Sequence, residues 1–295
     1  MPNVVVKDME ENFPFNRKPS KLRERAKLAR DKRVRELLLN LAKGSRKIDI
    51  EESLDELVAR GDSTSKALLL IALYYPVRLA DENPADPEAA SILINSRILL
   101  QEAGLEKAAE NLSKSLAKLG RALIAGISEI ADPEYAKKAA RAAVEIGKAI
   151  GDELLKAFGV ELLRYLGEPI EEEYTLDEEE LIELKLTLAA TLLTLGLFEA
   201  VKEVLKDVDI PQAHFIRAVA AILSDDKETR GMAIAKLREM EFPEAKFFLD
   251  VLEAIRCARI GDEKCFDKAI AAAQEKLAEV PELVGVLEFI KKLKA

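Results

Sequence analysis

The 295-residue sequence contains no tryptophan, one histidine and two cysteines. A structural zinc site takes about four Cys or His ligands, more than this sequence supplies in any one stretch. Two cysteines are also too few for the several bridges of a small disulfide-rich domain. Zinc-stabilised and disulfide-rich folds are therefore excluded, and we expect no bound metal.

Long apolar segments are missing as well. The longest uncharged apolar run covers residues 67–77, eleven residues, whereas about 20 are needed to cross a bilayer. The first twelve residues include Lys7, Asp8, Glu10 and Glu11, where a secretory signal would need an apolar stretch. We therefore expect no membrane insertion and a cytoplasmic location.

Good helix formers dominate in place of the missing residue types. Leu, Ala, Glu, Lys and Arg are abundant, and aromatic residues make up only 5% of the chain. Apolar residues recur with a period near 3.6, and no segment alternates with period two for long enough to predict a strand. The predicted fold class is all-α. Few glutamines beside many Glu, Lys and Arg residues also indicate a thermophilic source.

Charge is distributed unevenly along the chain. Residues 17–47 hold thirteen Lys or Arg against three acids, although the whole chain has a net charge of −9. Residues 168–183 hold nine acids and no base. We therefore divide the chain into an N-terminal extension with a basic amphipathic helix (1–48), an N-terminal helical region (49–167) and a helical region with an acidic start (168–295).

Glycine and proline mark the predicted helix ends, because glycine adopts the left-handed conformation after a helix and proline fits the first helical turn. Gly120 offers a break within the long helix at 105–130, and Thr175 is the predicted N-cap of the helix after the acidic segment. The predicted helices span 20–43, 50–60, 64–80, 87–103, 105–130, 133–150, 152–166, 176–195, 197–207, 211–223, 229–240, 243–260, 264–279 and 281–293.

A repeat is visible in the last third of the chain. Pro211, Pro243 and Pro281 each follow an acid and an apolar residue and precede Glu or Gln. They are 32 and 38 residues apart, the period of a two-helix repeat, and an Ala followed by Val or Ile lies ten to twelve residues before each. We expect each proline to open the first helix of a new pair, and the helix at 281–293 to cap the last pair.

Two segments of this region resemble the tetratricopeptide repeat family. Residues 196–201 (GLFEAV) and 265–270 (CFDKAI) are similar to the turn between the two helices of that repeat, and the likeness extends over about 184–295. The family's tryptophan is absent. The resemblance implies a solenoid of stacked antiparallel helix pairs with a peptide-binding groove. On that basis Arg217, Lys246 and Arg256 are candidate groove contacts, although the family's carboxylate clamp is not reproduced. The alternative is an irregular helical bundle.

The basic helix is the strongest local feature. Its apolar residues form one stripe, and the candidate contacts to an anionic partner lie outside it: Arg23, Lys27, Arg30, Lys32 and Arg33. Such a surface suits nucleic-acid phosphates or an acidic protein. The alternative is that it faces the chain's own acidic segment at 168–183. No aromatic residues are interleaved for base stacking, so nucleic acid would be held without sequence preference.

Cys257, Cys265 and His214 have mainly structural interpretations. The two cysteines flank the predicted turn at Gly261 and are either buried free thiols or a disulfide that joins the two helices. His214 has no cysteine or second histidine nearby and is interpreted as a buried structural residue.

No catalytic or phosphate-binding motif is recognised, so we expect no enzymatic activity and no cofactor. The preferred hypothesis is a scaffold that binds a protein or peptide. The second hypothesis is a protein associated with nucleic acid through the basic helix. The sequence leaves the oligomeric state open.

Overall fold

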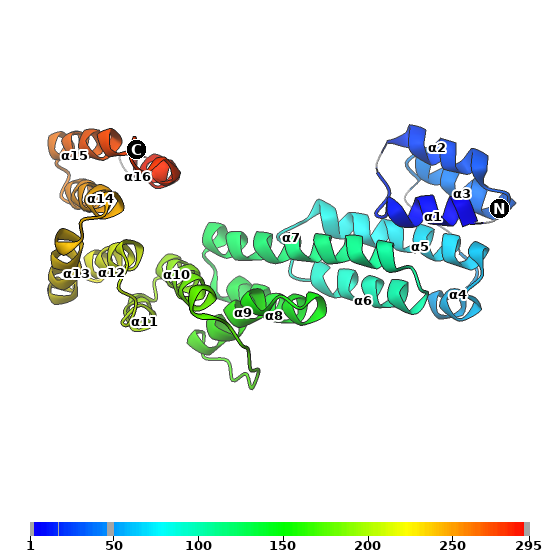
Figure 1. The fold of residues 1–295 in the computed structure, drawn as a ribbon, viewed down its shortest axis with the longest axis horizontal. Helices are drawn as coiled ribbons and strands as arrows, with labels where there is room; N and C mark the ends of the chain where they lie inside the picture. The colour runs from blue at the N-terminus through cyan, green and yellow to red at the C-terminus, as the bar shows by residue number, and fades with distance from the viewer. Residues whose placement is uncertain (1–2, 17, 46–49, 292–295) are drawn as a thin grey trace. The chain divides into compact units, whose positions relative to one another are not determined.

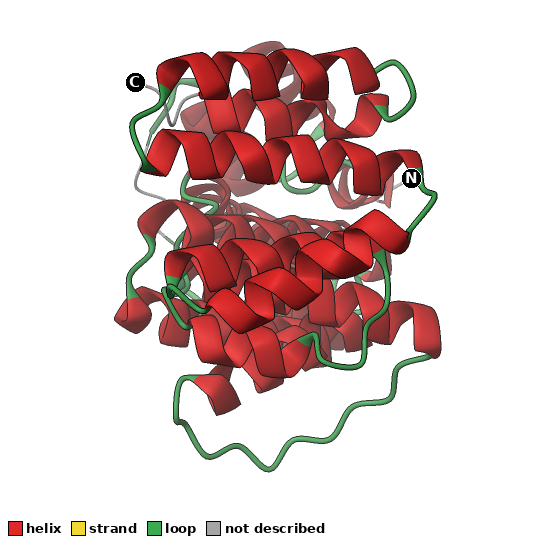
Figure 2. Cartoon of the chain, turned by 90° about the vertical axis from the view of Figure 1, so that its left-hand side faces the viewer, coloured by secondary structure: helices red, strands yellow, loops and turns green. Residues whose placement is uncertain are grey.

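The computed structural model describes residues 3–16, 18–45 and 50–291. Every regular element in these ranges is a helix, and they contain no strand (Figure 1, Figure 2). This confirms the predicted all-α fold class. None of the helices in these ranges combines the length and the apolar character that crossing a bilayer demands. The chain forms two compact units, Met1–Thr175 (unit 1) and Leu176–Ala295 (unit 2).

Unit 1 contains nine helices within its described residues, joined mostly by short loops. They are α1 (Asn3–Glu11), α2 (Pro19–Leu28), α3 (Lys32–Ala42), α4 (Leu54–Arg60), α5 (Ser63–Glu82), α6 (Ala89–Glu102), α7 (Glu106–Ile130), α8 (Pro133–Ile150) and α9 (Glu153–Tyr165). Consecutive helices pack side by side through most of the unit. The tightest approach is between α8 and α9, where Gly147 and Gly159 leave room for the backbone of the facing helix.

The N-terminal end of unit 1 differs from the prediction in two respects. Helix α1 was not predicted, and it packs against α2, α5 and α7. The single helix predicted at 20–43 is two helices, because the Asp31 side chain accepts a hydrogen bond from the Val34 N–H at 3.0 Å and caps α3. The Arg35 guanidinium in turn donates to the carbonyl of Ala29 at the end of α2.

One further prediction about a helix end is wrong. The N-cap of the helix predicted at 176–195 is Asp177, and not Thr175, because Asp177 and Glu180 form a reciprocal capping box. Helix α7 continues through Gly120 without a break. A side chain there would meet Leu155 of α9, so the glycine provides space for packing and does not end the helix.

Unit 2 is built from helix pairs. Its elements are α10 (Glu178–Thr194), α11 (Phe198–Val204), α12 (Pro211–Leu223), α13 (Lys227–Glu239), α14 (Pro243–Arg259), α15 (Glu263–Lys276), the 3-10 helix η1 (Pro281–Leu283) and α16 (Val284–Lys291). Each of α10, α12 and α14 packs against the helix that follows it. In addition, α12 packs against both α10 and α14, so the first helices of successive pairs lie next to one another.

Proline opens the elements of unit 2 as predicted. Pro211 and Pro243 are the first residues of α12 and α14, and Pro281 opens η1. The missing N–H of proline costs nothing in a first turn, where that donor has no partner within the helix. The expected α-helix begins later than predicted, at Val284, since the first turn is η1. Helix α16 buries Leu287 and Ile290 against α14 and α15.

Candidate functional site

Helices α2 and α3 carry the predicted basic residues. Arg23, Lys27, Arg30 and Lys32 are exposed, and Arg33 is partly exposed. Lys32 pairs with Glu36 at 3.9 Å and Arg33 with Glu51 at 3.8 Å. Arg23, Lys27 and Arg30 form no ion pair with any residue in the described ranges. The remaining basic residues at 17 and 46–47 lie outside the described residues.

The carboxylates of the acidic segment that lie in unit 1 form ion pairs with other cations. Glu168 binds Arg141 and lies 3.8 Å from Lys137, and Glu172 binds Lys148 at 2.5 Å. Those three cations belong to α8. The hydrogen bond from Arg141 holds the pKa of Glu168 below its ordinary value. Within the part of unit 1 that the structure describes, the ion pairs of this segment are therefore with α8, and Arg23, Lys27 and Arg30 form none with it.

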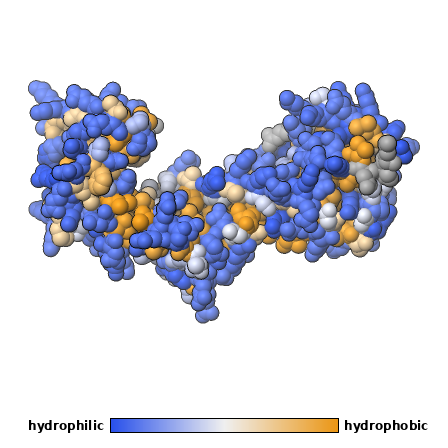
Figure 3. Space-filling view, in the orientation of Figure 1, coloured by the Kyte–Doolittle hydropathy of each residue, from blue (hydrophilic) through white to orange (hydrophobic). Residues whose placement is uncertain are grey.

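An open hollow of about 490 Å³ lies directly beside two of these cations. Its walls come from α1, from the loop between α2 and α3, and from the start of α5. The lining residues include Val4 and Leu28, which are 55% and 58% exposed, together with Lys27 and Arg30. Figure 3 shows hydrophobic atoms gathered at the α1–α3 end of unit 1 within a largely hydrophilic surface. The hollow thus joins an apolar wall to a rim that carries Lys27 and Arg30, while Asp31, Ser63 and Thr64 are also part of its lining.

A buried arginine of α2 contacts residues of two neighbouring segments next to this site. Arg25 of α2 is only 3% exposed, and its guanidinium binds the Asp8 carboxylate of α1. The same guanidinium lies 5.4 Å from the centre of the Phe15 ring, and Phe15 stacks on Tyr74 of α5 at 5.1 Å. These contacts connect α1, α2 and α5 around the hollow. The sequence does not separate Arg25 from the other basic residues at 17–47, because only the position of α1 distinguishes it from its neighbours.

The three predicted groove contacts in unit 2 do not form a cluster with one role. Arg217 donates to the carbonyl of Val208 at 3.3 Å and to His214, so it supports the loop before α12. Arg256 binds Glu253 of its own helix through two hydrogen bonds, of 2.8 and 2.6 Å. Lys246 is exposed on the first turn of α14. Only Lys246 is therefore left as an exposed cation with no ion pair among the described contacts.

His214 is a buried structural residue, as the sequence suggested. It is 3% exposed, and its Nε2 lies 2.6 Å from the Asp209 carboxylate while its Nδ1 lies 2.6 Å from Arg217 Nη2. Since the arginine is a donor only, its partner Nδ1 accepts, and Nε2 carries the proton of a neutral ring. Burial lowers the pKa of His214, and the positive charges of Arg217 and Lys236 add to the effect, while Asp209 opposes it.

This arrangement predicts an acid-sensitive stability of unit 2. An unfolded histidine titrates near pH 6.5, and its pKa is lower in the fold, so the unfolded chain binds the proton first as the pH falls. The free energy of unfolding should therefore decrease from pH ~7 towards pH ~5. His214→Gln keeps a donor and an acceptor but cannot titrate. Chemical denaturation across this range should show a smaller decrease for the variant, and identical pH dependence of the two proteins would contradict the prediction.

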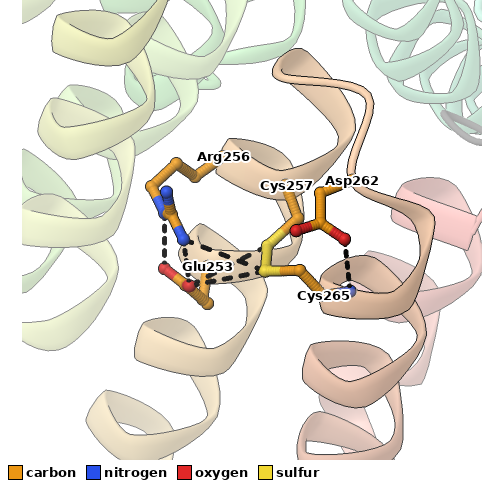
Figure 4. The surroundings of a disulfide bond; sticks show 5 residues. All are labelled: Glu253, Arg256, Cys257, Asp262 and Cys265. Carbon is orange, nitrogen blue, oxygen red and sulfur yellow. Dashed lines mark hydrogen bonds and ion pairs between the residues drawn. A yellow bond between two sulfur atoms is a disulfide. The ribbon is translucent and has the colours of Figure 1, made fainter.

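The structure joins Cys257 and Cys265 by a disulfide between α14 and α15, with the two Cα atoms 5.7 Å apart (Figure 4). Cys257 is fully buried, whereas Cys265 is partly exposed. Glu253 lies close to both sulfurs. In the described ranges, Glu253, Cys257 and Cys265 are the one set of three Asp, Glu, Cys or His residues whose possible metal-ligating atoms all lie within 4.8 Å of one another. In the disulfide form both sulfurs are bonded to each other, so neither is a thiolate that could bind a metal.

The fold defines an all-α protein in which neighbouring helices pack in pairs. No protein-family model, no curated protein and no solved structure matches the chain. Its function is therefore inferred from the surfaces described above, and the hollow beside Lys27 and Arg30 is the candidate functional site.

Proposed function

We propose that the protein is a non-enzymatic scaffold that binds an acidic, amphipathic segment of a partner protein in the hollow of unit 1. The observation that carries the proposal is the position of Lys27 and Arg30, which have no ion pair among the described contacts and rim an apolar wall. A helix with an apolar face and flanking carboxylates is complementary to both features. Its apolar side chains would cover Val4 and Leu28, and its carboxylates would meet the two cations.

The same surface favours a peptide over nucleic acid, the second candidate. Phosphate contacts would use the cations but would leave the apolar wall exposed to water. None of the residues that line the hollow is aromatic, so it offers no platform for base stacking. Nucleic acid would therefore contact only the two cations, whereas an acidic amphipathic segment would contact both the cations and the apolar wall.

Unit 2 is proposed to serve the scaffold as a short array of tetratricopeptide-like repeats. Two observations support this: the packing of α12 against both α10 and α14, and the prolines that open successive pairs. In such an array each pair contacts mainly its neighbours, and the stacked first helices present one continuous surface. Lys246 lies on that set of helices and is the candidate contact there.

Charge reversal at the rim of the hollow tests the proposal. The probes are a labelled helical peptide with one leucine face and one glutamate face, a peptide of the same composition in scrambled order, and duplex DNA. The double variant Lys27→Glu/Arg30→Glu should weaken binding of the amphipathic peptide about 10- to 100-fold in fluorescence anisotropy. Lys118→Glu/Arg121→Glu is the matched control, since these residues of α7 are also exposed, three apart in the sequence and without a described ion pair.

Leu28→Ser separates the two candidates, because the side chain is already largely exposed and its loss should leave the fold intact. We expect it to weaken peptide binding and leave DNA binding unchanged. Equal affinity for the ordered and scrambled peptides would overturn the proposal. Tighter binding of DNA than of the amphipathic peptide would favour nucleic acid instead. A plot of log affinity against log salt concentration should then have a negative slope of about 0.9 for each phosphate contact.

A further inference from the structure

The disulfide between α14 and α15 joins two cysteines that differ in their exposure to solvent (Figure 4). Cys257 lies in the last turns of α14 with no exposed surface, within the buried apolar cluster of unit 2. Cys265 lies in the first turn of α15 and is partly exposed. A thiolate from solution can therefore approach Cys265 and has no access to Cys257.

The surroundings of Cys265 suit a sulfur that carries negative charge. Its backbone N–H is bonded to the Asp262 side chain, the N-cap of the 14-residue helix α15, at 3.0 Å. The helix dipole lowers the pKa of a thiol in the first turn of a helix. The Arg256 guanidinium adds a positive charge 3.8 Å from the Cys265 sulfur.

Two carboxylates oppose this charge, that of the N-cap Asp262 and that of Glu253. The Glu253 carboxylate lies 3.6 Å from the sulfur of Cys265 and 3.8 Å from that of Cys257. Arg256 binds both carboxylate oxygens, and this ion pair holds the pKa of Glu253 below its ordinary value. Arg256 therefore offsets the repulsion that Glu253 would exert on an incoming thiolate and also contacts the reactive sulfur.

From this geometry we infer that Cys257 and Cys265 form a thiol–disulfide exchange site whose reactive sulfur is Cys265 and whose substrates are low-molecular-weight thiols and disulfides. A thiolate attacks the sulfur of Cys265, the bond to Cys257 breaks, and Cys257 leaves as a thiolate that takes up a proton. A second thiolate then attacks the mixed disulfide and releases Cys265. In total two external thiols are oxidised to one disulfide, and the protein disulfide is reduced to two thiols.

The reverse reaction assigns different roles to the two cysteines. The Cys265 thiolate attacks an external disulfide and forms a mixed disulfide, because it is the accessible and stabilised sulfur. Cys257 then displaces the external thiol and closes the bond between the helices. Cys257 is thus the resolving residue. This assignment concerns unit 2 and is independent of the peptide site in unit 1.

Intact-mass measurements on the full-length protein test the inference. Native protein incubated with reduced glutathione should be reduced without denaturant. After an acid quench and removal of the glutathione, alkylation in denaturant should then add two labels. The variants Cys257→Ala and Cys265→Ala each leave one thiol, and oxidised glutathione should modify Cys257→Ala, which retains Cys265, about 10-fold or more faster than Cys265→Ala. Equal or reversed rates, or reduction of the native protein only after denaturant is added, would overturn the assignment.

Arg256→Gln measures the electrostatic contribution in the Cys257→Ala background. Loss of the guanidinium leaves the Glu253 carboxylate unpaired beside Cys265, so modification by oxidised glutathione near neutral pH should slow by about three- to tenfold. Arg238→Gln is the matched control, since Arg238 is exposed on α13 and has no described ion pair. Equal rates for the two arginine variants would show that Arg256 has no part in the reaction.

Discussion

Gly159→Ala should destabilise unit 1 by about 3 kcal/mol or more, because an added methyl group meets atoms that cannot move aside. A Cβ atom at Gly159 would lie 2.5 Å from the Ala140 carbonyl oxygen and 2.8 Å from a methyl group of Val144, both on α8. The first of these belongs to the backbone of a helix, so relief requires α8 and α9 to separate. Separation would open one of the most closely packed interfaces of the unit.

Equilibrium unfolding in urea, followed by far-ultraviolet circular dichroism, measures this loss, and hydrogen exchange of the α8 and α9 amides locates it. Gly231→Ala is the matched control. Gly231 also lies within a helix, but no atom lies within 4 Å of the position its Cβ would take. Alanine should stabilise α13 there by about 0.5–1 kcal/mol, because it is the better helix former. Similar effects of the two substitutions would show that α8 and α9 do not approach as closely as described.

Phe247→Ala should destabilise unit 2 by about 3–5 kcal/mol, the usual cost of removing a fully buried aromatic side chain. Phe247 has no exposed surface and contacts Phe248 edge to face, with ring centres 5.7 Å apart. Phe248 in turn stacks on Phe215 of α12 at 4.4 Å. The substitution therefore leaves a cavity in the buried apolar cluster of unit 2, next to the Phe248 ring that joins α14 to α12.

Phe289→Ala is the matched control for this cavity. Phe289 lies on α16 with 64% of its surface exposed, so truncation there should change the free energy of unfolding by no more than about 0.5 kcal/mol. Urea unfolding of both variants, with hydrogen exchange of the α12 and α14 amides, checks the difference. If Phe247→Ala were as stable as Phe289→Ala, the aromatic cluster would not be part of the core of unit 2.

Most helices could be predicted because their signals are local. A period of 3.6 in apolar residues, a proline in the first turn and a glycine after the last turn all act within a few residues. Gly151 and Gly261 follow α8 and α14 with positive φ angles of 74° and 72°, which glycine adopts at little cost. The same local rules explain the errors: Asp31 and Asp177 were overlooked as N-caps although each provides a suitable carboxylate.

The candidate site could be predicted only in part. Sequence alone indicated a basic surface at Arg23, Lys27 and Arg30, because a run of cations is visible without knowledge of contacts. It did not show that α1 supplies an apolar wall next to Lys27 and Arg30. Nor did it show that Arg25, from the same basic run, is buried on Asp8. These distinctions depend on residues far apart along the chain.

The helical class, the positions of most helix ends and the segregation of charge can be predicted from the sequence, because each follows from local spacing and composition. Tertiary structure decided which charges find partners, as when Arg141 and Lys148 of α8 take the carboxylates of the acidic segment. It also decided that Cys257 is buried while Cys265 is accessible, and that Gly159 faces the α8 backbone. Pairing, burial and close approach are properties of two segments in contact, and no single segment specifies its neighbour.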